Sequence, residues 1–295
     1  MREDVIWTWL TPSQISEQLS ELGTPVCRDS VAVILEELGF RQRQAEKTLA
    51  MGAYPYRDEQ FLNIAALKEQ YLEAGEPVIS MDTKKKEFLG NFHRPGQVWT
   101  TGVLSTFDHD FHRSEYGNHV IPHGLYDVGR NVGHITLGVS HDTSQFACDC
   151  LYQWWQRYGC KDHRFSNSML LLCDAGGSNN YRHYIFKEDL QRLVNRLDLP
   201  IQVAHYPPYC SKYNPIERRL FSHVTRACRG VIFHTLDVVR RFMAKASTRT
   251  GLKVTVSTLL KEYKTQRAAT EAFLNNMPVI FDDYLPELNY ILVPQ

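Results

Sequence analysis

The order of apolar segments in the middle of the chain is the strongest constraint on its fold. Three strand-like segments come first, at Val78–Asp82, Glu87–Phe92 and Gly133–Val139. Helical and strand-like segments then alternate: a helix opened by Asp142-Thr143, a strand at Met169–Cys173, a helix at Arg182–Leu197, a strand at Ile201–His205 and a helix opened by Asn214-Pro215. A doubly wound sheet would alternate from the start and carry a Gly-rich turn after its first strand. The sequence has neither feature.

Three meandering strands followed by alternating elements are the order of a ribonuclease-H-like domain. The sequence therefore predicts an α/β fold with a mixed five-stranded sheet flanked by helices. Met169–Cys173 is wholly apolar, which favours a central strand covered on both faces. Residues 93–123 are rich in His, Asp and Gly, and we expect them to form a loop.

A small helical segment is predicted ahead of the sheet. Thr11–Gln14 has a capping Thr, a Pro at the first helical position and a Gln three residues after the cap, and Gly23 ends this helix. A second helix is predicted at about Arg28–Leu38. Its inward side is expected to consist of Val31, Ile34, Leu35 and Leu38. Two short helices around a Gly-containing turn are typical of a helix-turn-helix, and also of a plain helical hairpin.

These segments predict the domain organisation of the 295-residue chain. The predicted parts are a helix-turn-helix-like segment at 1–56, a connecting helix at 57–76, a ribonuclease-H-like domain at 77–255 and a C-terminal extension at 256–295. No apolar run reaches the roughly 18 residues that span a bilayer. The seven scattered cysteines indicate reduced thiols in a cytoplasm rather than a disulfide framework.

Charge is unevenly distributed although the net charge is zero. A balanced total taken alone argues against a nucleic-acid partner. Residues 1–76 carry 7 basic and 13 acidic side chains, whereas residues 206–253 carry 10 basic and 2 acidic ones. The positive field is thus concentrated in one stretch, for which a phosphate backbone is a natural partner.

Three carboxylates fall at related places in the predicted order. Asp82 closes the first strand, Asp174 closes the fourth, and Glu217 lies in the first turn of the last helix. Adjacent parallel strands bring their C-terminal ends together. Three converging carboxylates repel one another unless cations neutralise them, and such oxygen ligands suit Mg²⁺ or Mn²⁺. Two ions about 4 Å apart would serve phosphoryl transfer.

Each acidic residue also has a structural interpretation. Asp82 and Asp174 could open the turns that follow their strands. Glu217 could complete a capping box begun by Asn214. Asp142 is interpreted as the N-cap of the helix that follows it.

Four segments carry a resemblance to a known family. They are VISMDTKKKEFLGNF (78–92), GLYDVGRNVGHITLGVSHDTSQFACDCLYQWWQRYG (124–159), LLLCDAGGSNNYRHYIFKEDLQRL (170–193) and HYPPYCSKYNPIERRLFSHVTRACRG (205–230). They resemble the ISAzo-type transposases of bacterial insertion sequences, relatives of the mariner-like DDE/D enzymes. The motifs DTKKKE, DAGGSN and SKYNPIERRLFS are the most specific.

The resemblance implies a DNA transposase that cuts at element ends and joins the 3′-hydroxyl to target DNA. It aligns Asp82, Asp174 and Glu217 with the catalytic, metal-binding triad, and implies two Mg²⁺ ions, for which Mn²⁺ can substitute. Members of the family generally extend further at the N-terminus, so a truncated copy or an alternative start is expected. The alternative functions are a non-catalytic DNA-binding remnant and a ribonuclease-H-like nuclease acting on branched or hybrid nucleic acid.

The expected partners are double-stranded DNA, at element ends and target, and a second copy of the chain in a homodimer, with no membrane. We expect a cytoplasmic, nucleoid-associated protein. Basic residues near Glu217 would grip phosphates, unless they form a solvated helix face. The candidate DNA-binding residues are Lys212, Arg218, Arg219, Arg226 and Arg229, with Arg28 in the helix-turn-helix.

Overall fold

The computed structural model describes residues 5–43, 54–108 and 118–295. The chain divides into two compact units, Met1–Leu49 and Ala50–Gln295, which are described separately below. In the described parts of the chain, no helix combines the length and apolar character needed to cross a membrane. All seven cysteines are free thiols.

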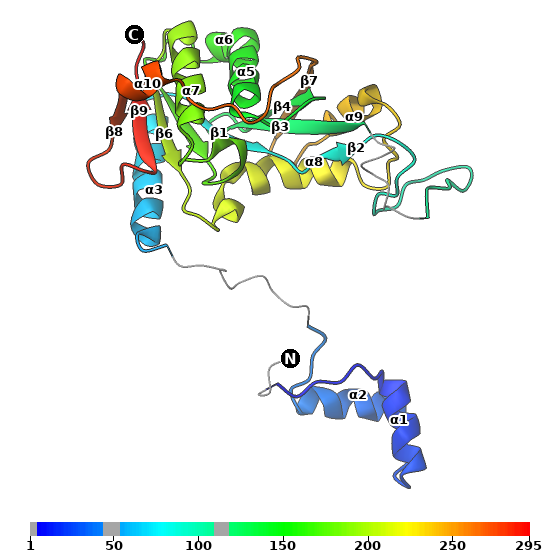
Figure 1. Cartoon of the computed structure of the whole chain (residues 1–295). Coiled ribbons are helices and arrows are strands. Elements are labelled where there is room, and N and C mark those ends of the chain that lie inside the picture. Colours follow the sequence, from blue (N-terminus) through cyan, green and yellow to red (C-terminus); the bar gives the residue numbers. More distant parts are fainter. Residues whose placement is uncertain (1–4, 44–53, 109–117) are drawn as a thin grey trace. The chain divides into compact units, whose positions relative to one another are not determined.

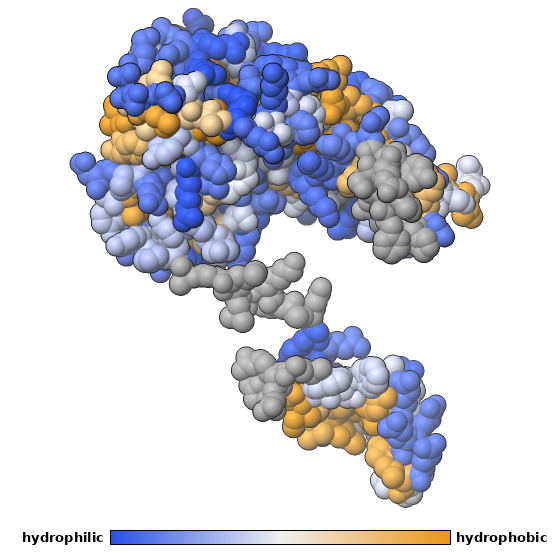
Figure 2. Space-filling model, viewed as in Figure 1, coloured by the Kyte–Doolittle hydropathy of each residue, from blue (hydrophilic) through white to orange (hydrophobic). Residues whose placement is uncertain are grey.

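The first unit contains the two predicted helices, α1 (Pro12–Glu21) and α2 (Arg28–Glu37). The predicted capping box is confirmed, because the Thr11 side chain accepts from the Gln14 backbone N–H and the Gln14 side chain accepts from the Thr11 backbone N–H. Val31 is the only buried side chain among residues 5–43. The predicted inward side was wrong at Ile34 and Leu38, which are 44% and 68% exposed, because two helices alone cannot cover them. Figure 2 shows the resulting apolar surface on this unit.

The second unit is built on one mixed sheet (Figure 1). Its strands are β1 (Val78–Thr83), β2 (Glu87–Phe88), β3 (His119–Asp127), β4 (Val132–Gly138), β5 (Met169–Cys173), β6 (Ile201–His205), β7 (Lys253–Leu259), β8 (Val279–Phe281) and β9 (Asn289–Leu292). The order across the sheet is β7-β4-β3-β1-β5-β6-β9-β8, with β2 paired to β3. β1, β3 and β4 form an antiparallel meander, whereas β5 and β6 continue from β1 in parallel. This is the ribonuclease-H-like arrangement that the sequence predicts.

Two details of the predicted sheet were wrong. The second strand of the meander is His119–Asp127, and only Glu87–Phe88 of the predicted strand Glu87–Phe92 is extended. The sheet of the described residues also has nine strands rather than five. Of the additional ones, β7 pairs in parallel with β4, and β8 and β9 extend the sheet beyond β6.

Helices cover both faces of the sheet (Figure 1). The α-helices of this unit are α3 (Arg57–Glu73), α5 (Ser144–Trp154), α6 (Cys160–Asp162), α7 (Tyr184–Leu197), α8 (Ser222–Ala227), α9 (Leu236–Met243) and α10 (Glu271–Asn275). Short π-helical and 3₁₀ segments are η1 (Trp155–Gly159), η2 (Gly177–Asn179), η3 (Ser211–Tyr213) and η4 (Glu217–Phe221). α5 and α7 pack on one face, and α3, η4–α8 and α9 pack on the other.

Strand alternation divides the side chains of β1 between these two faces. Ile79 and Met81 join the core beneath α5 and α7. Val78 joins the core beneath α3, and Ser80 bonds to the segment that leads into η4. Because Asp82 continues the even-numbered series, its carboxyl group belongs to the face on which η4 packs.

Gly124 on β3 allows η4 to approach the sheet closely. Its Cα pairs with that of Asp82 on β1. A Cβ at this position would lie 2.5 Å from Phe221 Cε1 and 2.8 Å from Ile216 Cδ1, and both neighbouring side chains are buried. The absence of a side chain here therefore sets the distance between η4 and the end of β1.

We expect Gly124→Ala to lower the free energy of unfolding by about 1–3 kcal/mol, because an added methyl group overpacks a buried contact. Urea denaturation monitored by circular dichroism measures the change. Gly102→Ala is the matched control, since a Cβ there meets no atom within 4 Å. Equal stabilities of the two variants would contradict this account of the packing.

Candidate active site

Asp82 and Asp174 lie side by side at one edge of the sheet. β1 and β5 pair in parallel, with Ser80 opposite Leu172 and Met81 opposite Cys173. The next residue on each strand is the aspartate, and neighbouring strands are about 4.8 Å apart. Both carboxyl groups belong to the even-numbered series that faces η4, and both side chains are half-buried. The strand register therefore brings together two acidic groups that are far apart in sequence.

Glu217 reaches the same edge from the first residue of η4. Ile216 and Leu220 are fully buried against the sheet and hold the segment in place. The Glu217 side chain is half-buried and makes a side-chain hydrogen bond with Asp82. A π-helical turn at this position is notable, because such turns occur frequently at functional sites. The structure thus brings all three predicted site residues together.

Burial holds the pKa values of all three carboxyl groups above the usual range, and their mutual repulsion adds to the rise at Asp82 and Asp174. Burial, followed by the charge of Asp174, raises the pKa of Asp82 to about 8, and Glu217 adds to the effect. Burial, reinforced by Glu217, raises the pKa of Asp174 to about 6. Burial raises the pKa of Glu217, whereas its hydrogen bond to Asp82 and the charge of Lys84 oppose the rise. The edge therefore concentrates negative charge that the surrounding protein only partly compensates.

A buried hydrogen-bond network connects the three elements that carry these carboxyl groups. The Asn214 amide donates to Asp174 Oδ1 at 2.9 Å. Ser80 Oγ donates to Asn214 Oδ1 and accepts from the Ile216 backbone N–H at 3.0 Å. β1, β5 and the start of η4 are thus joined through two fully buried side chains. Sequence reasoning missed Asn214 because it treated this residue as a helix cap.

Asp142 is a fourth carboxylate beside the site. The interpretation of Asp142 as a helix N-cap was wrong, because the side chain of Thr143 caps α5. Thr83 Oγ1 instead donates to Asp142 Oδ1 at 3.1 Å and lies 2.9 Å from His123 Nδ1. Burial lowers the pKa of His123 to about 3, so this imidazole is neutral. With the threonine proton directed at Asp142, His123 Nδ1 must donate to Thr83 Oγ1.

The donor set suits a hard divalent cation in charge and type. Asp82, Asp174 and Glu217 offer oxygen ligands only, which match Mg²⁺ or Mn²⁺. Burial raises all three pKa values, and the carboxylate repulsion that adds to the rise at Asp82 and Asp174 is what a cation would relieve. Within residues 5–43, 54–108 and 118–295, no three His, Cys, Asp or Glu side chains are already arranged to hold an ion. As they stand, Glu217 is hydrogen-bonded to Asp82, and Asp174 accepts from Asn214, so the fit is one of chemistry rather than of preformed coordination geometry.

The candidate DNA-binding residues of this unit are all exposed. Lys212, Arg218, Arg219, Arg226 and Arg229 lie on the segment from η3 to the turn that follows α8. None of them is ion-paired to another described residue. Arg226 is instead engaged by His223 Nδ1 at 3.2 Å and by the Ser247 carbonyl at 3.1 Å. In the first unit, Arg28 is exposed and lies 3.9 Å from Asp29.

The sheet order, with carboxyl groups at the ends of β1 and β5 and at the start of η4, defines a ribonuclease-H-like protein with an acidic edge. Over residues 1–294 the chain matches the family described as the Rhodopirellula transposase DDE domain. The chain belongs to this family. The resemblance to DDE transposases noted in the sequence is thereby confirmed.

Several solved structures are similar to this chain. A Mos1 transposase paired-end complex with the left transposon end has 14% identity and a TM-score of 0.48, and the match covers 79% of this chain and 65% of the solved one. A Mos1 mariner paired-end complex with Mn has 15% identity and a TM-score of 0.48, and the match covers 79% of this chain and 65% of the solved one. A pre-cleavage Mos1 transpososome has 15% identity and a TM-score of 0.48, and the match covers 79% of this chain and 66% of the solved one. The chain thus spans just under two thirds of the length of these proteins. No curated protein matches it.

We expect the metal-free protein to lose stability as pH rises from about 4 to about 8. Asp82 and Asp174 have raised pKa values in the folded state, so between the unfolded and folded values the native state binds more protons than the unfolded state. The stability that these protons confer is complete below the unfolded pKa and is lost as pH rises through the folded pKa. Urea denaturation in EDTA across this range measures the decline. Asp82→Asn should flatten it, and an unchanged profile would contradict the coupling.

We expect Asn214→Ala to lower the free energy of unfolding by about 1–3 kcal/mol, because it leaves the buried Ser80 hydroxyl without its acceptor. Ser80→Ala and the double variant complete a mutant cycle. The double variant should be less destabilised than the sum of the two single variants, since both partners are then removed. Strict additivity would show that the two side chains do not act as a pair.

Proposed function

We propose that this chain is a DNA transposase that uses the acidic edge to cut DNA at element ends and to join the freed 3′-hydroxyl to target DNA. Asp82, Asp174 and Glu217 are the proposed catalytic and metal-binding residues. The observation that supports the assignment best is their convergence from two strand ends and a helix start, with raised pKa values at each. Residues that served only in turns or as helix caps would not be expected to converge on one edge of the sheet.

The proposed metal ligands are the same three carboxylates, with two Mg²⁺ ions, or Mn²⁺, as the cofactor. When bound, divalent cations would activate the attacking oxygen and stabilise the leaving one in phosphoryl transfer. The chain's own residues orient the ligands. Asn214 donates to Asp174 and holds one carboxylate oxygen in place, while the Thr83 backbone N–H holds Asp82 Oδ1 at 2.7 Å. Each of these contacts occupies one oxygen of its aspartate, and a bound cation would replace the proton shared between Asp82 and Glu217.

The proposed DNA contacts lie beside this edge. Residues 206–253 carry 10 basic and 2 acidic side chains, and Arg218 and Arg219 directly follow Glu217. Because Arg218 and Arg219 are exposed and have no carboxylate partner among the described residues, their guanidinium groups are available to phosphate oxygens. Phosphate contacts supply affinity without sequence information. We propose that Arg28 contributes contacts from the helix-turn-helix, and that two copies of the chain act together in the cytoplasm on the two ends of one element.

We expect Asp174→Asn to abolish Mg²⁺-dependent DNA cleavage without unfolding the protein. Asn keeps the shape of the side chain and loses the charge that would bind the cation. Cleavage of duplex oligonucleotides containing an element end is compared with wild type by gel electrophoresis. Asp283→Asn is the matched control, because Asp283 is exposed and lies outside the site.

The substrate range of the wild type distinguishes the alternative functions. Cleavage at element ends followed by strand joining supports the transposase. Cleavage confined to branched DNA or to RNA–DNA hybrid would assign the chain to the nucleases instead. DNA binding without cleavage of any of these substrates in Mg²⁺ or Mn²⁺ would make it a non-catalytic remnant. Full activity of Asp174→Asn would refute the metal role of that residue.

A further inference from the structure

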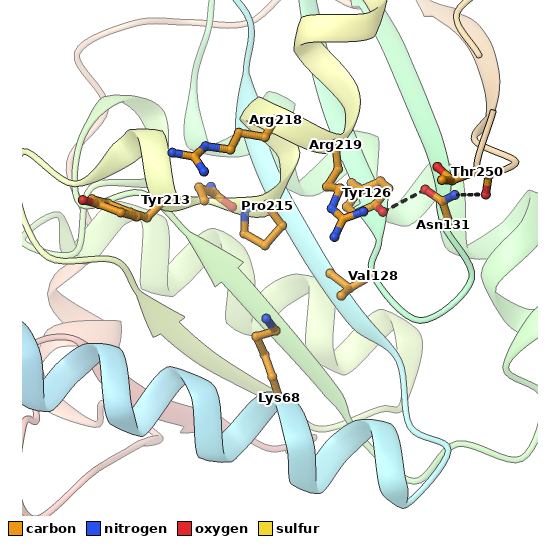
Figure 3. Close-up of a pocket in the computed structure, with 10 residues that line it drawn as sticks. Lys68, Tyr126, Val128, Asn131, Tyr213, Pro215, Arg218, Arg219 and Thr250 are labelled. Atoms are coloured by element: carbon orange, nitrogen blue, oxygen red, sulfur yellow. Dashed lines mark hydrogen bonds between the residues drawn. The ribbon is translucent and has the colours of Figure 1, made fainter. Parts of the chain in front are cut away.

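A basic cavity lies between α3 and the segment that leads into η4 (Figure 3). Its volume is about 480 Å³. Three cationic side chains line it: Lys68 from α3, and Arg218 and Arg219 from η4. Figure 3 shows Lys68 extending from its helix toward Pro215, while Arg219 enters beside Tyr126. The other lining side chains are polar or apolar, and no described carboxylate is among them.

The cations of this cavity are not neutralised by the protein. None of the three has an ion-pair partner in the parts of the chain that the structure describes. Lys68 is half-buried, whereas Arg218 and Arg219 are exposed. Like charges that line one recess oppose one another. An anion would relieve that repulsion and accept charge-assisted hydrogen bonds from these cations.

The far wall of the cavity is held rigidly by hydrogen bonds. Tyr126 Oη donates to Asn131 Oδ1 at 2.9 Å, and Asn131 Nδ2 donates to the Thr250 carbonyl at 3.1 Å. Asn131 has a φ of 54°, in the left-handed region that asparagine tolerates at a turn. Arg219 is close enough to Tyr126 for its charge to oppose the rise in pKa that burial causes at that hydroxyl. The wall therefore has its shape before any ligand arrives.

The cavity starts beside the acidic edge and runs away from it. Arg218 directly follows Glu217 in η4. Val128, which also lines the cavity, donates its backbone N–H to the Val78 carbonyl at the opposite end of β1 from Asp82. Val78 and Asp82 are four residues apart, which is about 13 Å along a strand. Nucleotides in duplex DNA rise about 3.4 Å each, so this length matches roughly four of them.

We infer that this cavity binds the phosphodiester backbone of DNA on its path away from the acidic edge, with Lys68 opposing Arg218 and Arg219 across one phosphate group. The inference rests on the proposed function, because it takes DNA as the substrate. It adds a binding residue from α3, which belongs to an element outside the basic stretch 206–253. α3 thereby has a role beyond covering the sheet.

The test is the salt dependence of DNA binding by the full chain. Fluorescence anisotropy with a labelled 30-base-pair duplex, and with the matching single strand, is recorded from 50 to 300 mM salt. Lys68→Met removes the charge and retains most of the aliphatic stem. We expect it to reduce the slope of log K against log salt by about 0.9 on duplex DNA, or about 0.7 on a single strand, which corresponds to weaker binding on the order of eightfold at 0.1 M salt.

Two further variants exclude a merely structural effect. Lys68→Arg keeps the charge and should retain the wild-type slope. Lys161→Met removes an exposed cation from α6, on the α5 and α7 side of the sheet, and should leave the slope unchanged. Thermal unfolding of each variant, followed by circular dichroism, verifies that the fold is intact. If Lys68→Met fails to fold, Lys68→Gln provides the same comparison.

The outcomes separate this inference from the proposed function. A wild-type slope for Lys68→Met, in a protein that binds and cleaves DNA, would overturn the inference and leave the transposase intact. A reduced slope in a protein that cleaves no DNA would support the cavity and reject the transposase. A loss seen only with single-stranded DNA would assign the cavity to an unpaired strand. A wild type that binds neither form of DNA would overturn both.

Discussion

The parallel pairing of β1 with β5 is the interaction on which the candidate site depends. Its register places Met81 beside Cys173, and Asp82 and Asp174 are the next residues along the two chains. A slip of one residue would turn every β1 side chain to the opposite face and direct Asp82 toward α5. The Ser80–Asn214–Asp174 network reinforces this register, because its hydrogen bonds together connect β1 and the end of β5 through the segment before η4. The position of Glu217 is therefore a consequence of the same pairing.

The strands that could be predicted from the sequence are those whose side chains face apolar surroundings on both sides. Met169–Cys173 and Ile201–His205 have the predicted bounds because their apolar runs need no partner to be recognised. β3 was missed because some of its residues suit contacts with neighbouring segments rather than the residue preferences of a strand. Gly124 leaves space for the Phe221 side chain, and His123 forms a hydrogen bond with Thr83. A histidine and a glycine suggest a loop until the packing of η4 supplies the reason for them.

The same distinction applies to the candidate site. The two aspartates could be found because a carboxylate that ends an apolar strand is conspicuous in a linear sequence. Asn214 and Asp142 could not, since their partners Ser80 and Thr83 are 134 and 59 residues away in sequence. A local pattern assigned each of them to the nearest helix as a cap. Hydrogen bonds between distant segments compete with capping, and the fold rather than the sequence neighbourhood decides between the two.

Segregated charge explains why a net charge of zero is misleading in this chain. Negative groups crowd at the ends of β1 and β5, and positive groups crowd in the cavity beside η4. Neither set neutralises the other, although Glu217 and Arg218 are adjacent in sequence, because successive residues of a helical segment point in different directions. A protein optimised only for stability would pair these charges. Keeping them apart destabilises the fold at both places, and bound cations and a phosphate backbone together would relieve both. The separation is thus the physical feature that best supports the proposed polyanionic substrate.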